Sequence, residues 1–134
     1  MWIENVSLEH IKQGIHYDAG VNSMLIQIVD PGTEFPTPKY EFKTVRQYRF
    51  LDVENEGMFT CEHAITDIDA ANIAADLLHA RDNSMNVIVH CHAGLCRSGA
   101  VAEVGVILGF QDTEKLRIPN LMVKSKLLEQ LGMI

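Results

Sequence analysis

Residues 87–100 read Val87-Ile88-Val89-His90-Cys91-His92-Ala93-Gly94-Leu95-Cys96-Arg97-Ser98-Gly99-Ala100. An apolar run comes first, then a glycine-containing loop, and then residues that favour a helix. A strand, a loop and a helix in this order gather backbone N–H groups and the positive end of a helix dipole around one point. We therefore predict a strand over residues 86–90, an anion-binding loop after it, and a helix over residues 98–109.

The rest of the chain predicts strands that alternate with helices. Residues 23–29 form a strand that is apolar on both faces, which is typical of a strand covered on both sides. A second strand is expected over residues 47–53. Such alternation favours an α/β fold with a parallel-dominated central sheet and helices on both faces. Because ligands bind beyond the carboxyl ends of the strands in such sheets, Cys91 falls at the expected place.

Four further helices are predicted. Ser7 caps a short helix that Gly14 ends. A long helix opens at Thr60 or Glu62 and runs to about residue 81, with residues 65, 68, 71, 75 and 78 as its apolar stripe. Residues 111–116 are expected to add a short helix. The last helix covers residues 120–131, after Pro119 and before a closing glycine.

Composition restricts the classes of protein that this sequence fits. The 134 residues, 47% of them hydrophobic, suit one domain over 1–134. A net charge of −7 argues against nucleic acid as a partner. The odd cysteine count (Cys61, Cys91 and Cys96), the early polar residues and the lack of a membrane-length apolar run predict a cytoplasmic, membrane-free protein with free thiols.

Each residue type in the loop suits one step of phosphate-monoester chemistry. Cys91 is a nucleophile whose thiolate form is favoured by an anion cradle. Arg97 holds two phosphate oxygens at once, a geometry that lysine cannot imitate. Ser98 donates a hydrogen bond to the Cys91 sulfur, His90 supports the loop, and Gly94 lets the backbone turn. The residues expected to surround the phosphate are His92, Ala93, Gly94, Leu95, Cys96 and Arg97.

The string His90-Cys91-x5-Arg97-Ser98 resembles the HCx5R(S/T) signature of the protein tyrosine phosphatase superfamily. Its flanks are similar to the VHCxAGxxRS form of the dual-specificity branch. Residues 49–53, residues 62–64 and Pro119-Asn120 are similar to small bacterial and phage members of that branch. The resemblance implies a phosphatase-type α/β domain. It also implies a phosphocysteine intermediate and a phosphorylated protein as substrate, with phosphotyrosine favoured and dual specificity left open.

The resemblance also implies a general acid on a loop upstream of the cysteine. It assigns this role to Asp52, which lies 39 positions before Cys91. Glu54 and Glu56 lie on the same loop and remain alternatives. Asp67 and Asp69 fall inside the predicted helix and are less suited.

Cys96 departs from the dual-specificity pattern. A cysteine directly before Arg-Ser is similar to the Cys-x4-Cys-Arg-Ser loop of the low-molecular-weight tyrosine phosphatases, although those carry the loop at the N-terminus. Cys96 is interpreted either as a small apolar filler or as a redox partner that traps oxidised Cys91 as a reversible disulfide.

Two other functions are compatible with a cysteine loop of this kind. A rhodanese-like or arsenate-reducing enzyme also builds a cysteine loop, and a non-catalytic phosphoprotein-binding module would use the same anion site. The His-Cys-His-x3-Cys spacing is not that of a zinc finger, so no metal is expected, nor any cofactor. We expect a monomer that acts on phosphorylated proteins.

Overall fold

Parallel strands pair into a five-stranded sheet in the computed structural model, which describes residues 1–54 and 63–134. The strand order is β3-β2-β4-β1-β5. In chain order the described elements are β1 (Trp2–Ser7), α1 (Leu8–Gln13), β2 (Ser23–Val29), β3 (Thr44–Arg49), α2 (Asp67–Asp82), β4 (Asn86–Cys91), α3 (Arg97–Ile107), β5 (Gln111–Asp112) and α4 (Leu121–Gln130).

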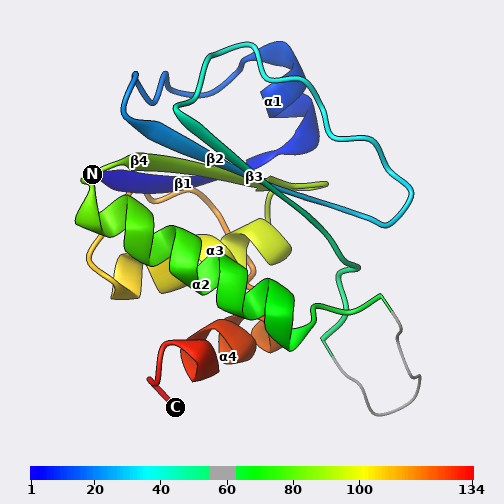
Figure 1. The fold of residues 1–134 in the computed structure, drawn as a ribbon. Coiled ribbons are helices and arrows are strands. Elements are labelled where there is room, and N and C mark those ends of the chain that lie inside the picture. The colour runs from blue at the N-terminus through cyan, green and yellow to red at the C-terminus, as the bar shows by residue number, and fades with distance from the viewer. Residues whose placement is uncertain (55–62) are drawn as a thin grey trace.

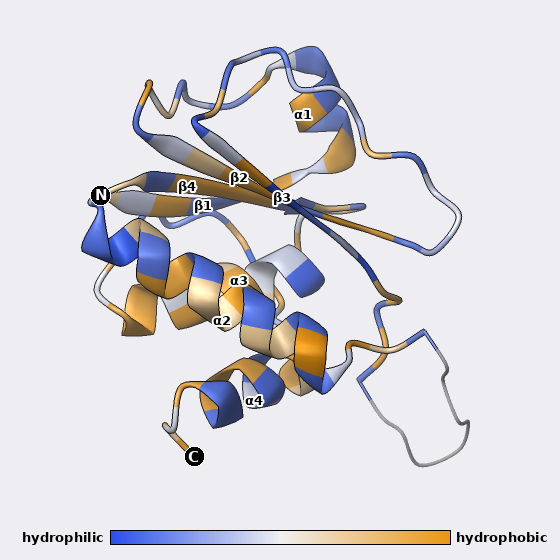
Figure 2. Ribbon diagram, viewed as in Figure 1, coloured by the Kyte–Doolittle hydropathy of each residue, from blue (hydrophilic) through white to orange (hydrophobic). Residues whose placement is uncertain are grey.

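The helices cover both faces of the sheet, as the sequence predicts (Figure 1). Helix α1 lies on one face, and α2 and α3 lie on the other, where α4 packs against both. All seven residues of β2 are buried. In Figure 2 the helices alternate between hydrophobic and hydrophilic bands, the pattern of amphipathic helices that pack on a sheet. The chain is therefore an α/β domain with its core on both sides of β2 and β4.

The alternation in β2 sorts its side chains between two cores. Met24, Ile26 and Ile28 join the larger core under α2 and α3, whereas Leu25 joins the smaller core under α1. A buried polar cluster fixes β3 to α2 in the larger layer: the Tyr48 hydroxyl donates to the Asp76 carboxylate, and Arg46 Nε lies 3.0 Å from the same group. Burial and the Asp76 carboxylate raise the pKa of Tyr48, so its hydroxyl stays protonated as the donor.

The strands of the structure differ from the sequence analysis in three places. Strand β1 was not predicted, because buried Glu4 and Asn5 in its middle interrupt the apolar pattern. Strand β3 ends at Arg49 rather than at residue 53, which leaves residues 50–54 as a loop. Residues 111–116 do not form a helix, since Gln111 and Asp112 pair with β1 as strand β5.

The long helix also differs from the prediction. Helix α2 begins at Asp67, because the Thr66 side chain accepts from the Asp69 N–H and Asp69 accepts from the Thr66 N–H. Thr60 and Glu62, predicted to open it, lie outside the described residues. The buried face is Ala70, Ile73, Ala74, Asp76, Leu77 and Ala80. Ile68 of the predicted stripe is 74% exposed, because the neighbouring apolar series meets the sheet instead.

The other helices agree closely with their predictions. Ser7 caps α1 by accepting from the His10 N–H, and Gly14 ends that helix in the left-handed region. Helix α4 has Asn120 as its N-cap. Within the described ranges, every helix is too short or too polar to cross a membrane.

Candidate active site

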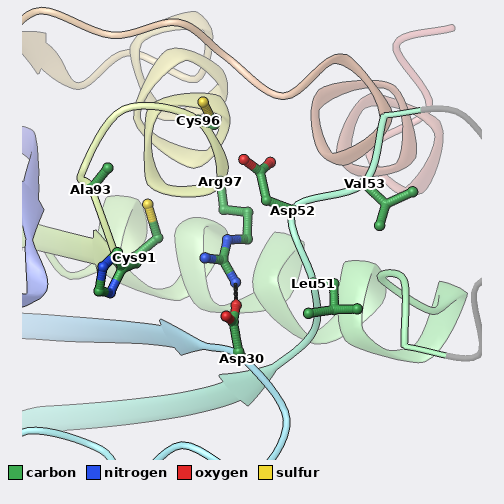
Figure 3. Close-up of a pocket in the computed structure, with 9 residues that line it drawn as sticks. Asp30, Leu51, Asp52, Val53, Cys91, Ala93, Cys96 and Arg97 are labelled. Atoms are coloured by element: carbon green, nitrogen blue, oxygen red, sulfur yellow. Dashed lines mark hydrogen bonds and ion pairs between the residues drawn. The ribbon is translucent and has the colours of Figure 1, made fainter.

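The residues singled out by sequence gather at the carboxyl edge of the sheet. Strand β4 ends there with Cys91, Asp30 directly follows the end of β2, and the chain leaving β3 passes the same point. A cavity of about 400 Å³ opens between them, lined by Asp30, Leu51, Asp52, Val53, Cys91, His92, Ala93, Cys96 and Arg97 (Figure 3). The topology thus brings the predicted nucleophile, arginine and acid into one cavity.

Cys91 is buried at the end of β4, and its sulfur lies 3.1 Å from the Ser98 hydroxyl in the first turn of α3. A serine hydroxyl at this distance stabilises a thiolate by donating to it. The contact between these two residues, predicted from their spacing, is present. Helix α3 begins at Arg97, directly after the loop, so the N-terminal end of its dipole faces the same region.

Gly94 gives the loop its shape. Its φ of +77° lies in the left-handed region, which glycine adopts without strain. A Cβ at this position would lie 2.5 Å from the Val6 carbonyl carbon and 2.6 Å from the Ser7 nitrogen. The end of β1 therefore packs directly against the loop backbone. Asn5 strengthens the contact, because its Nδ2 donates to the Gly94 carbonyl oxygen at 2.7 Å.

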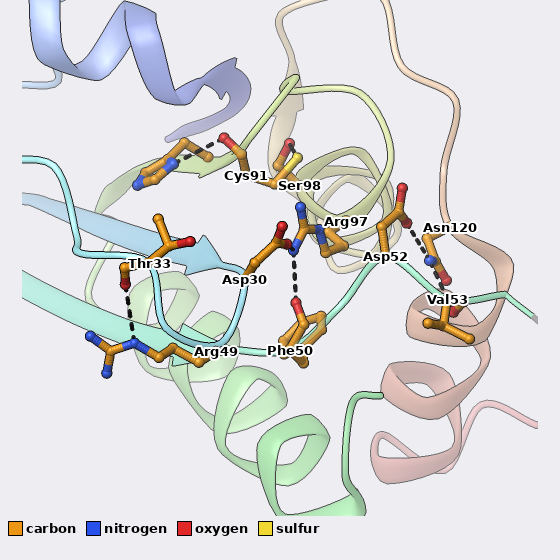
Figure 4. A network of polar contacts seen from close by, with 11 residues as sticks. Asp30, Thr33, Arg49, Phe50, Asp52, Val53, Cys91, Arg97, Ser98 and Asn120 are labelled. Carbon is orange, nitrogen blue, oxygen red and sulfur yellow. Dashed lines mark hydrogen bonds and ion pairs between the residues drawn. The ribbon is translucent and has the colours of Figure 1, made fainter. Parts of the chain in front are cut away.

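Among the described residues, the hydrogen bonds of the Arg97 side chain all come from one nitrogen. Its Nη1 donates to Asp30 Oδ1 at 2.6 Å and to the Phe50 carbonyl oxygen at 2.7 Å (Figure 4). The side chain is 5% exposed, and its Nε lacks a hydrogen-bond partner among the described residues. Buried N–H donors are nearly always satisfied in folded proteins. Among the described residues, the guanidinium therefore keeps an unsatisfied donor, while its side chain lines the cavity.

His90 is buried and neutral. Its Nδ1 donates to the Cys91 carbonyl oxygen at 3.1 Å, which requires the proton to sit on Nδ1 because a carbonyl can only accept. Burial lowers the pKa of His90, the hydrogen bond to the Cys91 carbonyl partly offsets this, and the positive charge of Arg97 adds to the decrease, which together give a pKa of about 4. This hydrogen bond joins His90 to the backbone of the next residue, and Nε2 has no partner among the described residues, so the support of the loop by His90 stays a prediction.

Asp52 and Glu54, both considered for the acid, occupy different surroundings. Asp52 lines the cavity together with Cys91, and its Oδ1 accepts from Asn120 Nδ2 at 2.6 Å. Glu54 is not among the cavity residues, and its Oε1 lies 3.4 Å from the Leu121 nitrogen at the start of α4. Glu56 lies outside the described residues. Of the two described candidates, Asp52 has access to the cavity.

Cys96 lines the cavity beside Asp52 and is a free thiol, as is Cys91 (Figure 3). Burial, and after it the charge and hydrogen bonding of Asp52, raise the pKa of Cys96. Its thiol is therefore held protonated against the carboxylate. The filler and redox interpretations of Cys96 both remain predictions, and Cys61 lies outside the described residues.

Sequence reasoning missed three residues of the site: Asn5, Asp30 and Asn120. Asp30 directly follows a buried strand, so the rule that parallel sheets bind ligands at their carboxyl edge could have located it. Asn120 was recognised only as part of a likeness at the start of the last helix. Asn5 gave no signal, because the strand that carries it was not predicted.

The fold and site define the class only as a parallel α/β domain with a cavity that a cysteine and an arginine line. No protein-family model matches the sequence, and no curated protein is significantly similar to it. The particular activity therefore rests on the geometry of the cavity.

Proposed function

We propose that this chain hydrolyses phosphate monoesters through a phosphocysteine intermediate. The observation that carries the proposal is the cavity that Cys91 and Arg97 line together, with the Arg97 side chain buried and its Nε without a hydrogen-bond partner among the described residues. A phosphate dianion bound there would satisfy the guanidinium and lie against the nucleophile. Because the charge of the transferring phosphoryl group spreads over its equatorial oxygens, positioning and electrostatic stabilisation supply most of the rate.

The first step forms a sulfur–phosphorus bond. The Cys91 thiolate attacks phosphorus while the bond to the leaving oxygen breaks, and Asp52, protonated at this stage, gives its proton to that oxygen. In the second step a water molecule attacks phosphorus and loses a proton to the Asp52 carboxylate. The sulfur–phosphorus bond breaks, and Ser98, 3.1 Å from the sulfur, stabilises the departing thiolate.

The substrate class that we propose is a phosphotyrosine-containing protein, with phosphoserine and phosphothreonine as further substrates. Leu51, Val53 and Ala93 give the cavity an apolar wall. Such a wall suits the ring of a phosphotyrosine, whose phosphate then lies at Arg97. Phosphotyrosine should therefore give the higher kcat/KM of the two substrate types.

The proposal is tested by hydrolysis of p-nitrophenyl phosphate and of phosphotyrosine and phosphoserine peptides. We expect turnover by the wild type and none by Cys91→Ser. Asp52→Asn should be slower by about 10²–10⁴-fold, the usual contribution of a general acid. Glu54→Gln is the matched control, since it removes a neighbouring carboxylate outside the cavity. Absence of turnover with retained phosphopeptide binding would show that the protein is a phosphopeptide-binding module rather than an enzyme.

The rhodanese-like and arsenate-reducing alternatives are separated by the same preparation. Rapid quenching during turnover of a phosphorus-labelled substrate should leave the label on Cys91 as a phosphothioester. Sulfur transfer from thiosulfate or arsenate reduction, with no label on Cys91, would reject the hydrolase.

A further inference from the structure

Asn120 joins three parts of the site. Its side chain is fully buried, and it is the N-cap of helix α4. It contacts residues 50–54, which we call the acid loop because they carry Asp52 and Glu54. Its Nδ2 donates to Asp52 Oδ1 at 2.6 Å and to the Val53 carbonyl oxygen at 3.2 Å (Figure 4). Its backbone N–H donates to the Cys96 carbonyl oxygen at 2.9 Å. One residue therefore joins the acid loop to residues 91–96, which we call the cysteine loop.

The remaining polar atom of this side chain is also used. Asn120 Oδ1 accepts from the Val123 N–H at 3.0 Å, which caps α4. The side chain at position 120 therefore has to donate N–H hydrogen bonds to Asp52 and Val53 and to accept one from Val123. An asparagine side chain has the length and the polar groups for both. Aspartate and serine can keep the cap, but neither offers the paired N–H donors that face Asp52 and Val53.

We infer that Asn120 is a positioning residue for the proton donor, an inference that rests on the proposed function. Its two N–H bonds fix the Asp52 carboxylate and the backbone of the next residue relative to the cysteine loop. The Asp52 proton can then reach the leaving oxygen of a substrate held by Arg97. A group fixed in this way delivers its proton without first losing the freedom of a mobile side chain.

The effect of losing this positioning should depend on how basic the leaving group of the substrate is. A leaving group that is already a weak base departs without a proton, whereas a strongly basic one needs the acid. Loss of the Asn120 donors should therefore slow the hydrolysis of phenyl phosphate far more than that of 2,4-dinitrophenyl phosphate. A residue that merely keeps the protein folded would slow both substrates by the same factor.

The experiment compares kcat/KM of wild type and Asn120→Ser on these two substrates. Serine retains an α4 cap, and thermal unfolding checks that the variant is folded. We expect a loss of about tenfold or more on phenyl phosphate and less than threefold on 2,4-dinitrophenyl phosphate, since small misplacements of a catalytic group are worth up to ~10²-fold. Equal losses on the two substrates would overturn the inference.

A double-mutant cycle gives the second readout. Asp52→Asn removes the donated proton, so adding Asn120→Ser to it should cause no further loss on phenyl phosphate. If the two losses multiply instead, Asn120 acts independently of Asp52 and the inference is wrong. Failure of the proposed function itself looks different, because wild type would then lack turnover on both substrates or Cys91→Ser would retain it.

Discussion

Asp30→Asn tests how the charge of Asp30 affects the binding of phosphate in the cavity that Cys91 and Arg97 line. The Asp30 carboxylate lies 2.6 Å from Arg97 Nη1 and lines the same cavity, with half of its side chain exposed. It therefore partners the guanidinium in the absence of a ligand and opposes a dianion that enters. Asparagine keeps an oxygen that can accept the hydrogen bond, and the Phe50 carbonyl oxygen at 2.7 Å still holds Nη1 in place. The substitution removes charge with little change of geometry.

The expected loss of stability is modest. Arg97 keeps its charge in the variant, so its hydrogen bond to the amide oxygen is still one from a charged donor. The substitution removes only the ion-pair contribution of a half-exposed carboxylate, which is about 0.5–1 kcal/mol. The free energy of unfolding should fall by about that amount, which lowers Tm by roughly 2–4 °C for a domain of this size. Inorganic phosphate should bind the variant more tightly, because the repelling carboxylate is gone.

The assay is thermal unfolding at increasing concentrations of inorganic phosphate. A ligand that binds the folded state alone raises stability with its concentration, so the difference between variant and wild type should shrink as phosphate saturates the cavity. Asp82→Asn, at the far end of α2, removes the same charge away from the cavity and should respond to phosphate as wild type does. Weaker phosphate binding by Asp30→Asn would refute the reasoning, since it would mean that Asp30 assists the anion.

Three further predictions follow from single contacts. Gly94→Ala should destabilise the protein by about 2–4 kcal/mol and abolish activity, because the added Cβ would clash with the β1 backbone. The control is Gly20→Ala, since Gly20 has a similar φ of +81° and its Cβ would meet nothing within 4 Å. Denaturant titrations of this control should show only the ~1–2 kcal/mol cost of the left-handed backbone. The pKa of His90 is about 4 in the folded state, below the ordinary value, so the free energy of unfolding should fall by roughly 3 kcal/mol as pH drops from about 6.5 towards 4. His90→Asn should flatten that part of the pH–stability curve. An unchanged slope would contradict the lowered pKa of His90. Under peroxide, a Cys91–Cys96 disulfide should form faster as pH rises, because the raised pKa keeps Cys96 protonated at neutral pH; recovery by mass spectrometry of over-oxidised Cys91 alone, at every pH, would favour the filler interpretation.

Local chemistry made the cysteine loop predictable. Strand β4, the turn at Gly94 and the contact between Cys91 and Ser98 all depend on residues close in sequence, whose preferences agree. The burial pattern of β2 was equally clear, because each of its faces meets a core.

The parts that could not be predicted depend on distant pairing. Asp30 and Arg97 are 67 positions apart, as Arg46 and Asp76 are 30 apart, and single-sequence patterns carry no information on such partners. The same limit hid β1, whose buried polar residues are acceptable only because of what the fold places around them. The Asn5 side chain, for example, is satisfied by backbone carbonyls 89 and 111 positions away.

Those two Asn5 hydrogen bonds constrain the order of folding. The loop around Gly94 reaches its final shape only when β1 has docked beside β4 and when the backbone near Leu116 has arrived on its other side. Contacts that close such long loops form slowly, since their closure entropy is lost before they contribute any stability. We therefore expect the cavity that Cys91 and Arg97 line to form late in folding. During refolding its capacity to bind phosphate should appear with the last kinetic phase, after most of the helical signal has returned.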